Sequence, residues 1–233
     1  MKSDALGFLY PHVDAQNCVN CGLCEKTCPF TPDYETPFHF PQVKTYAGRH
    51  NNIKEVEKSQ SGGAFVALSD WILKQDGVVY GAGYKEHFRV AHKRASTQNE
   101  RDEFRGSKYV QSDLTGVFKS VKEDLKNGLT VMFSGTPCQV AGLAAFVGKQ
   151  NRANLFLMDI VCHGVPAPNI WRDYLTYIET KTKKEIVKTN FRDKSIGGWH
   201  NTYESFKLND ESIIVKKTFT NLFYSRIDLR YSC

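Results

Sequence analysis

Four of the seven cysteines in the chain lie close together, in the stretch CVNCGLCEKTCP at residues 18–29. Three cysteines at two-residue intervals wrap the backbone around an inorganic core, so that each thiolate reaches a different iron of one 4Fe–4S cluster. Gly22 relieves the crowding where this loop approaches the core. Zinc or a disulfide knot is the alternative, but zinc motifs usually contain two separated cysteine pairs. The spacing predicts an iron–sulfur cluster with these ligands: Cys18, Cys21, Cys24 and Cys28.

The same run leaves the number of clusters open. In ferredoxins with two clusters, the fourth cysteine of such a run precedes proline and binds the other cluster. The sequence contains no second run, so Cys28 has no obvious second cluster. Either the run completes one cluster by itself, or a remote cysteine contributes, or the sequence is a shortened form. We therefore expect one or two clusters.

The composition is that of an ordinary globular protein, with 41% hydrophobic and 24% charged residues. No run of about 18 apolar residues is present, so we expect no membrane span. The first residues lack the pattern of a secretory signal, and we expect a cytoplasmic protein. Because disulfides are rare in that compartment, the cysteines are predicted to be metal ligands or catalytic thiols.

The net charge is +6, and part of it lies in the basic stretch 181–194. Binding of nucleic acid would call for aromatic platforms or a recognisable reader fold beside this stretch, and neither is apparent. We expect a solvated face at the end of a helix, with an anionic substrate or an acidic redox partner as the alternative. The sequence therefore predicts no nucleic-acid binding.

Helical and strand-like patterns alternate after a Pro-rich stretch at residues 29–42, which predicts a linker. The expected helices are 61–75, 112–128, 137–149 and 166–180, and the expected strands are 77–84, 129–135 and 154–162. The final third is more typical of antiparallel strands. The pattern predicts an α/β core with a mostly parallel sheet, preceded by a small ferredoxin-like 4Fe–4S segment.

Three turns in this α/β region are candidates for binding an anion. Ser61, Gly62 and Gly63 precede a predicted helix, where free backbone N–H groups favour phosphate. A second turn is basic, and a third follows the end of a strand, where ligands of open α/β sheets bind. Their residues are Gly106, Ser107 and Lys108, and Gly135 and Thr136. An ordinary helix cap is the alternative at each turn, and no G-x-G-x-x-G fingerprint is present.

The remaining cysteines are Cys138, Cys162 and Cys233. Cys138 and Cys162 follow corresponding strand ends, so these two could lie near each other. Buried core thiols are the alternative, because cysteine is often buried. Cys233 is at the last position of the sequence, where a core residue would be unusual.

The sequence contains, in this order, the segments GFLYPHVDAQNCVNCGLCEKTCP, SQSGGAF, GVVYGAGY, RGSKYVQS, FSGTPCQVAGL, DIVCHGVPAP and NFRDKSIGGW. Over about residues 6–233 they resemble the coenzyme F-420 hydrogenase/dehydrogenase beta subunit family. This resemblance implies an iron–sulfur flavoprotein oxidoreductase, with FAD on an α/β core that exchanges electrons with 4Fe–4S clusters. It also implies a small-molecule hydride donor or acceptor and a redox partner protein or subunit.

The resemblance divides the chain into a partial ferredoxin-type segment (1–40) and two parts of a flavin-binding region (41–125 and 126–233). Compared with similar bacterial proteins, the sequence looks shortened at both ends. The FAD phosphates are expected at Ser61–Gly63 and Gly135–Thr136, with Lys108 offsetting their charge. No side chain is predicted as a catalytic acid or base.

The resemblance also suggests a cluster beside the flavin, bound by Cys138, Cys162 and Cys233, whose fourth cysteine would lie beyond residue 233. Core or surface thiols are the alternative. Two alternatives to the flavoenzyme remain at this point. One is a non-catalytic electron-transfer subunit that connects a partner enzyme. The other is an incomplete family member with little activity.

Overall fold

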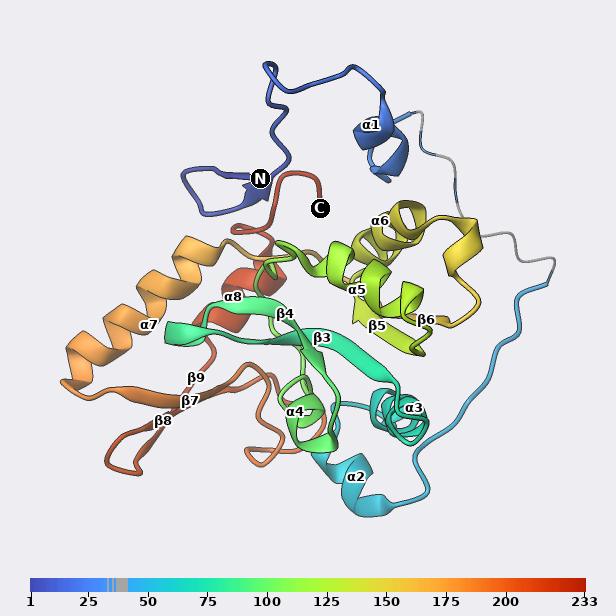
Figure 1. Cartoon of the computed structure of the whole chain (residues 1–233). Helices are drawn as coiled ribbons and strands as arrows, with labels where there is room; N and C mark the ends of the chain where they lie inside the picture. Colours follow the sequence, from blue (N-terminus) through green and yellow to red (C-terminus); the bar gives the residue numbers. More distant parts are fainter. Residues whose placement is uncertain (33, 35, 37–41) are drawn as a thin grey trace.

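A computed structural model describes residues 1–32, 34, 36 and 42–233 of the chain (Figure 1). Part of the linker predicted at residues 29–42 thus lies outside the described residues. The remaining chain forms a larger sheet with helices on both faces, a smaller sheet with two helices, and an N-terminal segment (Figure 1).

The larger sheet has the strand order β4–β3–β5–β6. Its strands are β3 (Val78–Tyr84), β4 (Val90–Ala95), β5 (Val131–Gly135) and β6 (Leu155–Asp159). β3 pairs in parallel with β5, and β5 pairs in parallel with β6, whereas β4 returns antiparallel to β3. The predicted α/β core with a mostly parallel sheet is confirmed, but the sequence patterns did not predict the antiparallel edge strand β4.

Helices cover both faces of this sheet because its strands alternate their side chains. Val78 and Tyr80 of β3 pack with α5 (Val117–Lys126) and α6 (Pro137–Val147). Val79, between them, faces the opposite side, toward α3 (Ala64–Leu73). Figure 1 shows α3 and α4 (Gln98–Asp102) on this second side.

Two predicted boundaries differ from the structure. The helix expected at 112–128 begins at Val117, after Gly116 at φ 79°. Residues before it run beside the sheet instead, because the Asp113 N–H donates to Val90 O (3.0 Å) and its carbonyl accepts from His92 N–H (3.0 Å). The strand expected at 154–162 ends at Asp159, so Cys162 lies in the following loop.

The smaller sheet consists of β7 (Ile186–Asn190), β8 (Glu204–Leu208) and β9 (Ile213–Lys216). Both of its pairings are antiparallel, as the sequence predicts for the final third. α7 (Pro168–Thr182) and α8 (Thr218–Ser225) pack against it through buried apolar side chains. Trp171 of α7 and Phe219 of α8 are in edge contact within this core, with ring centroids 5.0 Å apart.

A buried carboxylate joins the smaller sheet to both helices. Glu204 of β8 is 0% exposed. It accepts hydrogen bonds from Phe219 N–H (3.0 Å) and Thr220 N–H (2.9 Å), which belong to the first turn of α8. It also accepts from Tyr174 O–H of α7 (2.6 Å). A carboxylate at this point satisfies N–H groups that have no partner within the helix, and it favours the helix dipole.

The N-terminal segment contains β1 (Lys2–Ser3), β2 (Leu9–Tyr10) and α1 (Leu23–Thr27). α1, which includes Cys24, packs against α6. The short helix α2 (Ile53–Lys58) follows the undescribed residues. No helix in the described part of the chain is both long and apolar enough to cross a membrane.

We expect Glu204→Gln to lower the free energy of unfolding by about 3 kcal/mol, because an amide NH₂ would face donors that need an acceptor. Denaturant unfolding monitored by circular dichroism measures this change. The matched control is Glu123→Gln on the exposed side of α5, which we expect to leave the stability nearly unchanged. Equal stability of the two variants would contradict the assigned role of Glu204.

Candidate functional site

A cavity of about 560 Å³ lies between the carboxyl ends of β5 and β6 and the start of α3. Such a volume is within the range of small-molecule and cofactor sites. All eight residues predicted to bind a cofactor line it: Ser61, Gly62, Gly63, Gly106, Ser107, Lys108, Gly135 and Thr136. The three turns thus meet in one place, although they are far apart in the sequence.

The start of α3 is the more open of the two helix starts at this cavity. Its N-cap residue, Gly63, has φ 83° and makes no side-chain cap hydrogen bond. The first N–H groups of a helix have no partner within the helix, so this turn offers donors to an anion. A Cβ on Gly62 would lie 2.8 Å from Gly48 O, which explains the glycine by close packing of the chain.

The start of α6 is already bonded within the chain. Thr136 N–H donates to Gln139 Oε1 at 3.0 Å, which satisfies one donor of the turn. The hydroxyl of Thr136 lies 3.2 Å from Cys138 Sγ. Of the two predicted phosphate sites, the one at α3 therefore has the freer donors.

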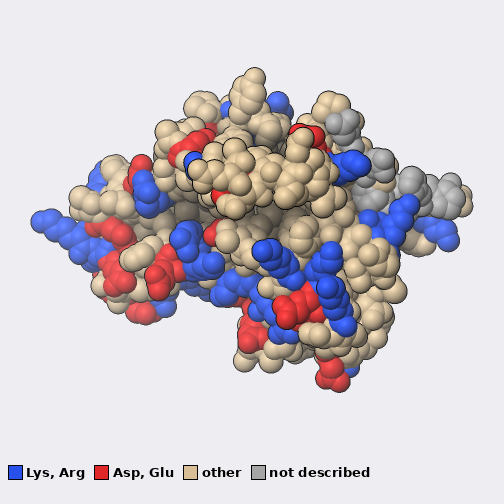
Figure 2. Space-filling model, turned by 45° about the horizontal axis from the view of Figure 1, so that its top comes forward, with Lys and Arg blue, Asp and Glu red and all other residues tan. Residues whose placement is uncertain are grey.

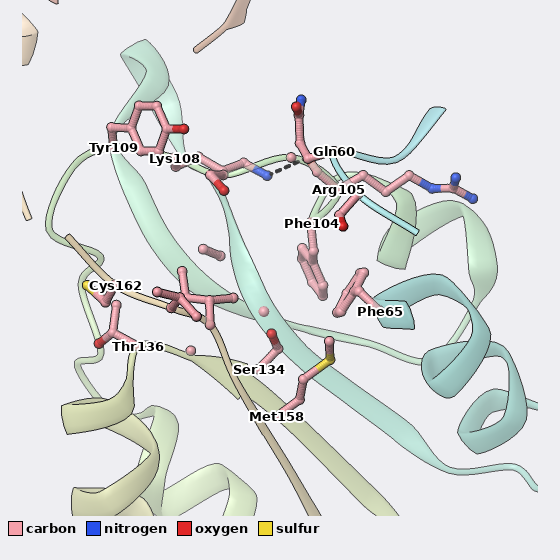
Figure 3. Close-up of a pocket in the computed structure, with 18 of the residues that line it drawn as sticks. Gln60, Phe65, Phe104, Arg105, Lys108, Tyr109, Ser134, Thr136, Met158 and Cys162 are labelled. Atoms are coloured by element: carbon pink, nitrogen blue, oxygen red, sulfur yellow. Dashed lines mark hydrogen bonds between the residues drawn. The ribbon is translucent and has the colours of Figure 1, made fainter. Parts of the chain in front are cut away.

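Lys108 reaches into the cavity from the turn after α4 (Figure 3). Its ammonium donates to Glu103 O (2.7 Å) and Arg105 O (3.1 Å), which leaves one of its three N–H donors unassigned. Burial lowers the pKa of Lys108 to about 7, with a smaller opposing effect from Glu103. The charge of this side chain therefore depends on whether an anion is bound beside it.

Two polar side chains that sequence reasoning did not select also line the cavity. Gln60 donates from Nε2 to Arg192 O (2.9 Å), which ties the loop before α3 to the loop after β7. Gln60 Oε1 and Arg192 Nε are buried and have no hydrogen-bond partner within the described residues. Both occur in segments that carry the family resemblance, but only the fold shows that they face one cavity.

Lys194 strengthens the same connection. It donates to Ser59 O and lies 3.8 Å from the centre of the Trp199 ring. Ser59 O is exposed to this contact because α2 has just ended at Lys58. The loop that carries Ser61–Gly63 is therefore held in place by residues that follow β7 of the smaller sheet.

His92 of β4 forms part of the cavity wall. One ring nitrogen lies 2.9 Å from Ser134 O, a pure acceptor, so Nε2 carries the proton. Nδ1 then accepts from Ser112 O–H at 2.7 Å. Burial lowers the pKa of His92 to about 4, and the hydrogen bond to Ser134 O opposes this shift only in part.

The end of the cavity away from the start of α3 is lined by aromatic rings and by Cys162. Tyr109 is stacked on Phe223 of α8, with ring centroids 4.4 Å apart. His163 makes an edge contact with the same Phe223 ring at 5.0 Å. Figure 3 shows Cys162 beside Thr136, across the cavity from Phe65 and Phe104. The rings of Tyr109 and Phe223 offer flat surfaces on which an aromatic ligand could stack.

Cys138 and Cys233 lie near Cys162, although the three are far apart in the sequence. Partial burial raises the pKa of the Cys162 thiol, and the neighbouring Cys138 and Cys233 raise it further. Arg230 N–H donates to Val165 O (3.0 Å), which brings the last residues beside the loop of Cys162. Cys162 and Cys233 are exposed and Cys138 is half-buried, so they are not core thiols, and surface thiols stay the alternative to cluster ligands.

The cysteines of the N-terminal run form no disulfide, and Cys18, Cys21 and Cys24 are exposed. Among the described residues, no three His, Cys, Asp or Glu side chains converge on a point that could hold a single metal ion. The thiolates of a 4Fe–4S cluster bind separate irons, so they need not share such a point. A set of cysteine thiols is the donor set that such a cluster requires, and in this respect the run fits it. The assignment of all seven cysteines as ligands stays a prediction.

Figure 2 shows several Lys and Arg side chains along the lower side of the hollow in the middle of one face, with some Asp and Glu side chains among them. This agrees with the net charge of +6. A field of this sign raises the local concentration of anionic ligands.

Residues 128–226 match the family described as the C terminus of the coenzyme F420 hydrogenase/dehydrogenase beta subunit. Residues 10–31 match a 4Fe–4S binding domain. The predicted resemblance is confirmed by these two matches, the first of which covers less than half of the chain. No curated protein matches the chain.

A solved structure also resembles the chain, namely a chain of the F420-reducing [NiFe] hydrogenase complex from Methanosarcina barkeri, determined with xenon derivatisation. The TM-score is 0.51 with 15% sequence identity, over 84% of this chain and 67% of that chain. At this identity the likeness concerns the fold alone.

We expect the stability of the protein to fall as the pH drops from 6.5 to 4, in part because of His92. The folded protein keeps His92 neutral down to about pH 4, whereas the unfolded chain is protonated below about 6.5. The unfolded state therefore binds more protons in this window, which costs up to about 3 kcal/mol. Denaturant unfolding at pH 7, 5 and 4 measures the loss. His92→Gln should show a shallower decline, and an identical decline in both proteins would rule out this contribution.

Proposed function

We propose that the chain is an iron–sulfur flavoprotein oxidoreductase subunit, which passes electrons between a hydride donor or acceptor, FAD and 4Fe–4S clusters. The observation that carries this proposal is the cavity itself. It joins the three predicted anion-binding turns to the stacked rings of Tyr109 and Phe223 and to Cys162, near which Cys138 and Cys233 lie.

The residues of the cavity fit FAD in several respects. The start of α3 would hold a phosphate through its N–H groups, and Lys108 would add a charge beside it. The buried atoms Gln60 Oε1 and Arg192 Nε, which have no partner among the described residues, would find partners in a polar ligand. Tyr109 and Phe223 would flank a ring system.

When bound, FAD would supply the exchange between two-electron hydride chemistry and the one-electron steps of a cluster. The protein's own contribution is position. Its aromatic end brings a ring beside Cys138, Cys162 and Cys233, which we propose as ligands of a cluster. Cys18, Cys21, Cys24 and Cys28 would bind a second one, within the segment that packs through α1 against α6.

A partner protein is part of the proposal. The similar solved structure is a hydrogenase complex, and an electron carrier needs a protein to receive or supply its electrons. The Lys and Arg side chains along the lower side of the hollow in Figure 2, with the net charge of +6, favour an acidic partner or an anionic substrate.

Anaerobic reconstitution with iron, sulfide and FAD tests this proposal. We expect about one FAD and about four to eight irons per chain, measured by released flavin and iron content. Cys138→Ser and Cys21→Ser should each reduce the iron content and the visible absorption. A Cys138→Ser protein that kept all its iron and its full visible absorption would exclude the cluster beside the flavin.

The outcome also separates the alternatives. Iron without flavin would replace the flavoenzyme by an electron-transfer subunit that connects a partner enzyme. Lys119→Gln, on the exposed side of α5 and away from the cavity, is the control for flavin binding. Arg192→Gln should lower the flavin content, whereas Lys119→Gln should not.

The affinity for FAD should depend on pH through Lys108. Its pKa of about 7 without ligand should rise when a phosphate is bound beside it. Affinity should therefore be constant below pH 7 and fall above it, by at most about tenfold per pH unit. Equilibrium dialysis of FAD at pH 6, 7 and 8.5 measures this. Lys108→Gln should bind more weakly and with little pH dependence, and an unchanged profile in this variant would contradict the role of Lys108.

A further inference from the structure

A second cavity, of about 710 Å³, lies between the β3–β4 hairpin and the first turn of α7. It shares only Val110 with the cavity described above. The function proposed above assigns no role to it. Most of its lining residues are polar or charged, with the hairpin on one side and Trp171 and Arg172 of α7 on the other.

The lining carries four cationic side chains and one acid, Glu86. The cationic residues are Lys85, Lys93, Arg89 and Arg172. Lys93 is already bound to Glu103, and Arg172 binds its neighbour Asp173 at the surface (3.0 Å). Lys85 and Arg89 form no ion pair or side-chain hydrogen bond within the part of the chain that the structure describes.

Asp113 is near enough to Lys85 and Arg89 for their charges to act on it, but it forms no ion pair with either among the described residues. Burial raises its pKa, yet its hydrogen bonds with Thr115 and the charges of Lys85 and Arg89 lower it overall. Its Oδ1 accepts from Thr115 N–H at 2.8 Å. A single carboxylate without an ion pair to either residue offsets the two positive charges only in part.

Lys85 and Arg89 are also forced close to each other. Lys85 N–H donates to Arg89 O at 2.8 Å, and they continue the register in which Tyr84 is paired with Val90. Residues directly opposite each other in such a pair have Cβ atoms about 5 Å apart, and like charges there are destabilising. The hairpin therefore brings two positive charges without an ion-pair partner together in the lining of the cavity.

The turn that does this is strained. His87 and Phe88 both have positive φ values, 53° and 54°, in a position where Asn-Gly is usual. Residues other than glycine are strained in this left-handed region, because Cβ approaches the following carbonyl oxygen. Trp171 Nε1–H donates to Phe88 O (3.2 Å), and the Phe88 ring packs on Tyr84, so the neighbouring core holds the turn in this form. Strain of this kind is often found where a ligand is held.

We propose that this cavity binds a small phosphate-containing anion between Lys85 and Arg89, with Arg172 at its far side. A ligand phosphate would remove the repulsion between the two opposed cations, and Arg binds phosphate through two parallel N–H donors. The volume suits a small molecule rather than a flat protein surface. The proposal does not depend on FAD or on a cluster.

Calorimetric titration of the 233-residue chain with inorganic pyrophosphate tests the site. We expect saturable binding to the wild-type protein, and a loss of affinity of about tenfold or more in Lys85→Gln/Arg89→Gln. The control, Lys119→Gln/Lys126→Gln, removes the same charge from exposed positions of α5 and should bind as the wild type does. Pyrophosphate should also raise the melting temperature of the wild type and of the control, but not of the hairpin variant.

The hairpin variant is expected to fold, because Lys85 and Arg89 are exposed and their repulsion opposes the fold. Absence of pyrophosphate binding to the wild type would overturn the proposal. So would binding that survives in the hairpin variant but is lost in Arg192→Gln, since the phosphate would then occupy the first cavity. An equal loss in the control would overturn it too, by showing a general charge effect. Binding of a poly-glutamate peptide but not of pyrophosphate, with the same dependence on Lys85 and Arg89, would replace the small ligand by an acidic polypeptide.

Discussion

The parallel pairing of β3, β5 and β6 is the constraint on which the candidate site depends. Parallel strands end at the same edge of a sheet, and Gly135 of β5 is paired directly with Asp159 of β6. The loops that follow must therefore leave the sheet side by side. One of them leads into α6, whose first turn carries Cys138, and the other carries Cys162. The approach of two cysteines that are separated by a whole helix is thus a consequence of strand register.

The smaller sheet and its helices complete the cavity that the strand ends of the larger sheet begin to form. Glu204 holds the first turn of α8 against β8, and α8 places Phe223 on Tyr109 at the aromatic end of the cavity. At the other end, Arg192 and Lys194 hold the loop before α3. Neither end is formed by the larger sheet alone. A substitution in the smaller sheet or its helices can therefore alter the cavity at both ends, through the contact of Phe223 with Tyr109 and that of Arg192 with Gln60.

Sequence patterns predicted the parts of this molecule that depend on local periodicity. The alternation of Val78, Val79 and Tyr80, and the turn chemistry of Gly63 and Gly135, are local signals. The edge strand β4 was not predicted, because its residues VAHKRA are polar on the exposed side and its partner is known only once the hairpin exists. Gln60 and Arg192 were not predicted either, since their shared hydrogen bond joins positions 132 residues apart. A pairing of that separation leaves no trace in a single sequence.

Two helices connect the cysteine-rich N-terminal segment to the cavity. α1 includes Cys24 and packs against α6, whose first turn includes Cys138 and whose N-cap residue Thr136 lines the cavity. Cys28 ends α1, and its N–H donates to Glu25 O (3.2 Å), so the run follows the position of that helix. The contact between α1 and α6 thereby determines where any group bound by the run lies relative to the cavity. The packing of two helices, rather than the cysteine spacing, places the two thiol sets relative to each other.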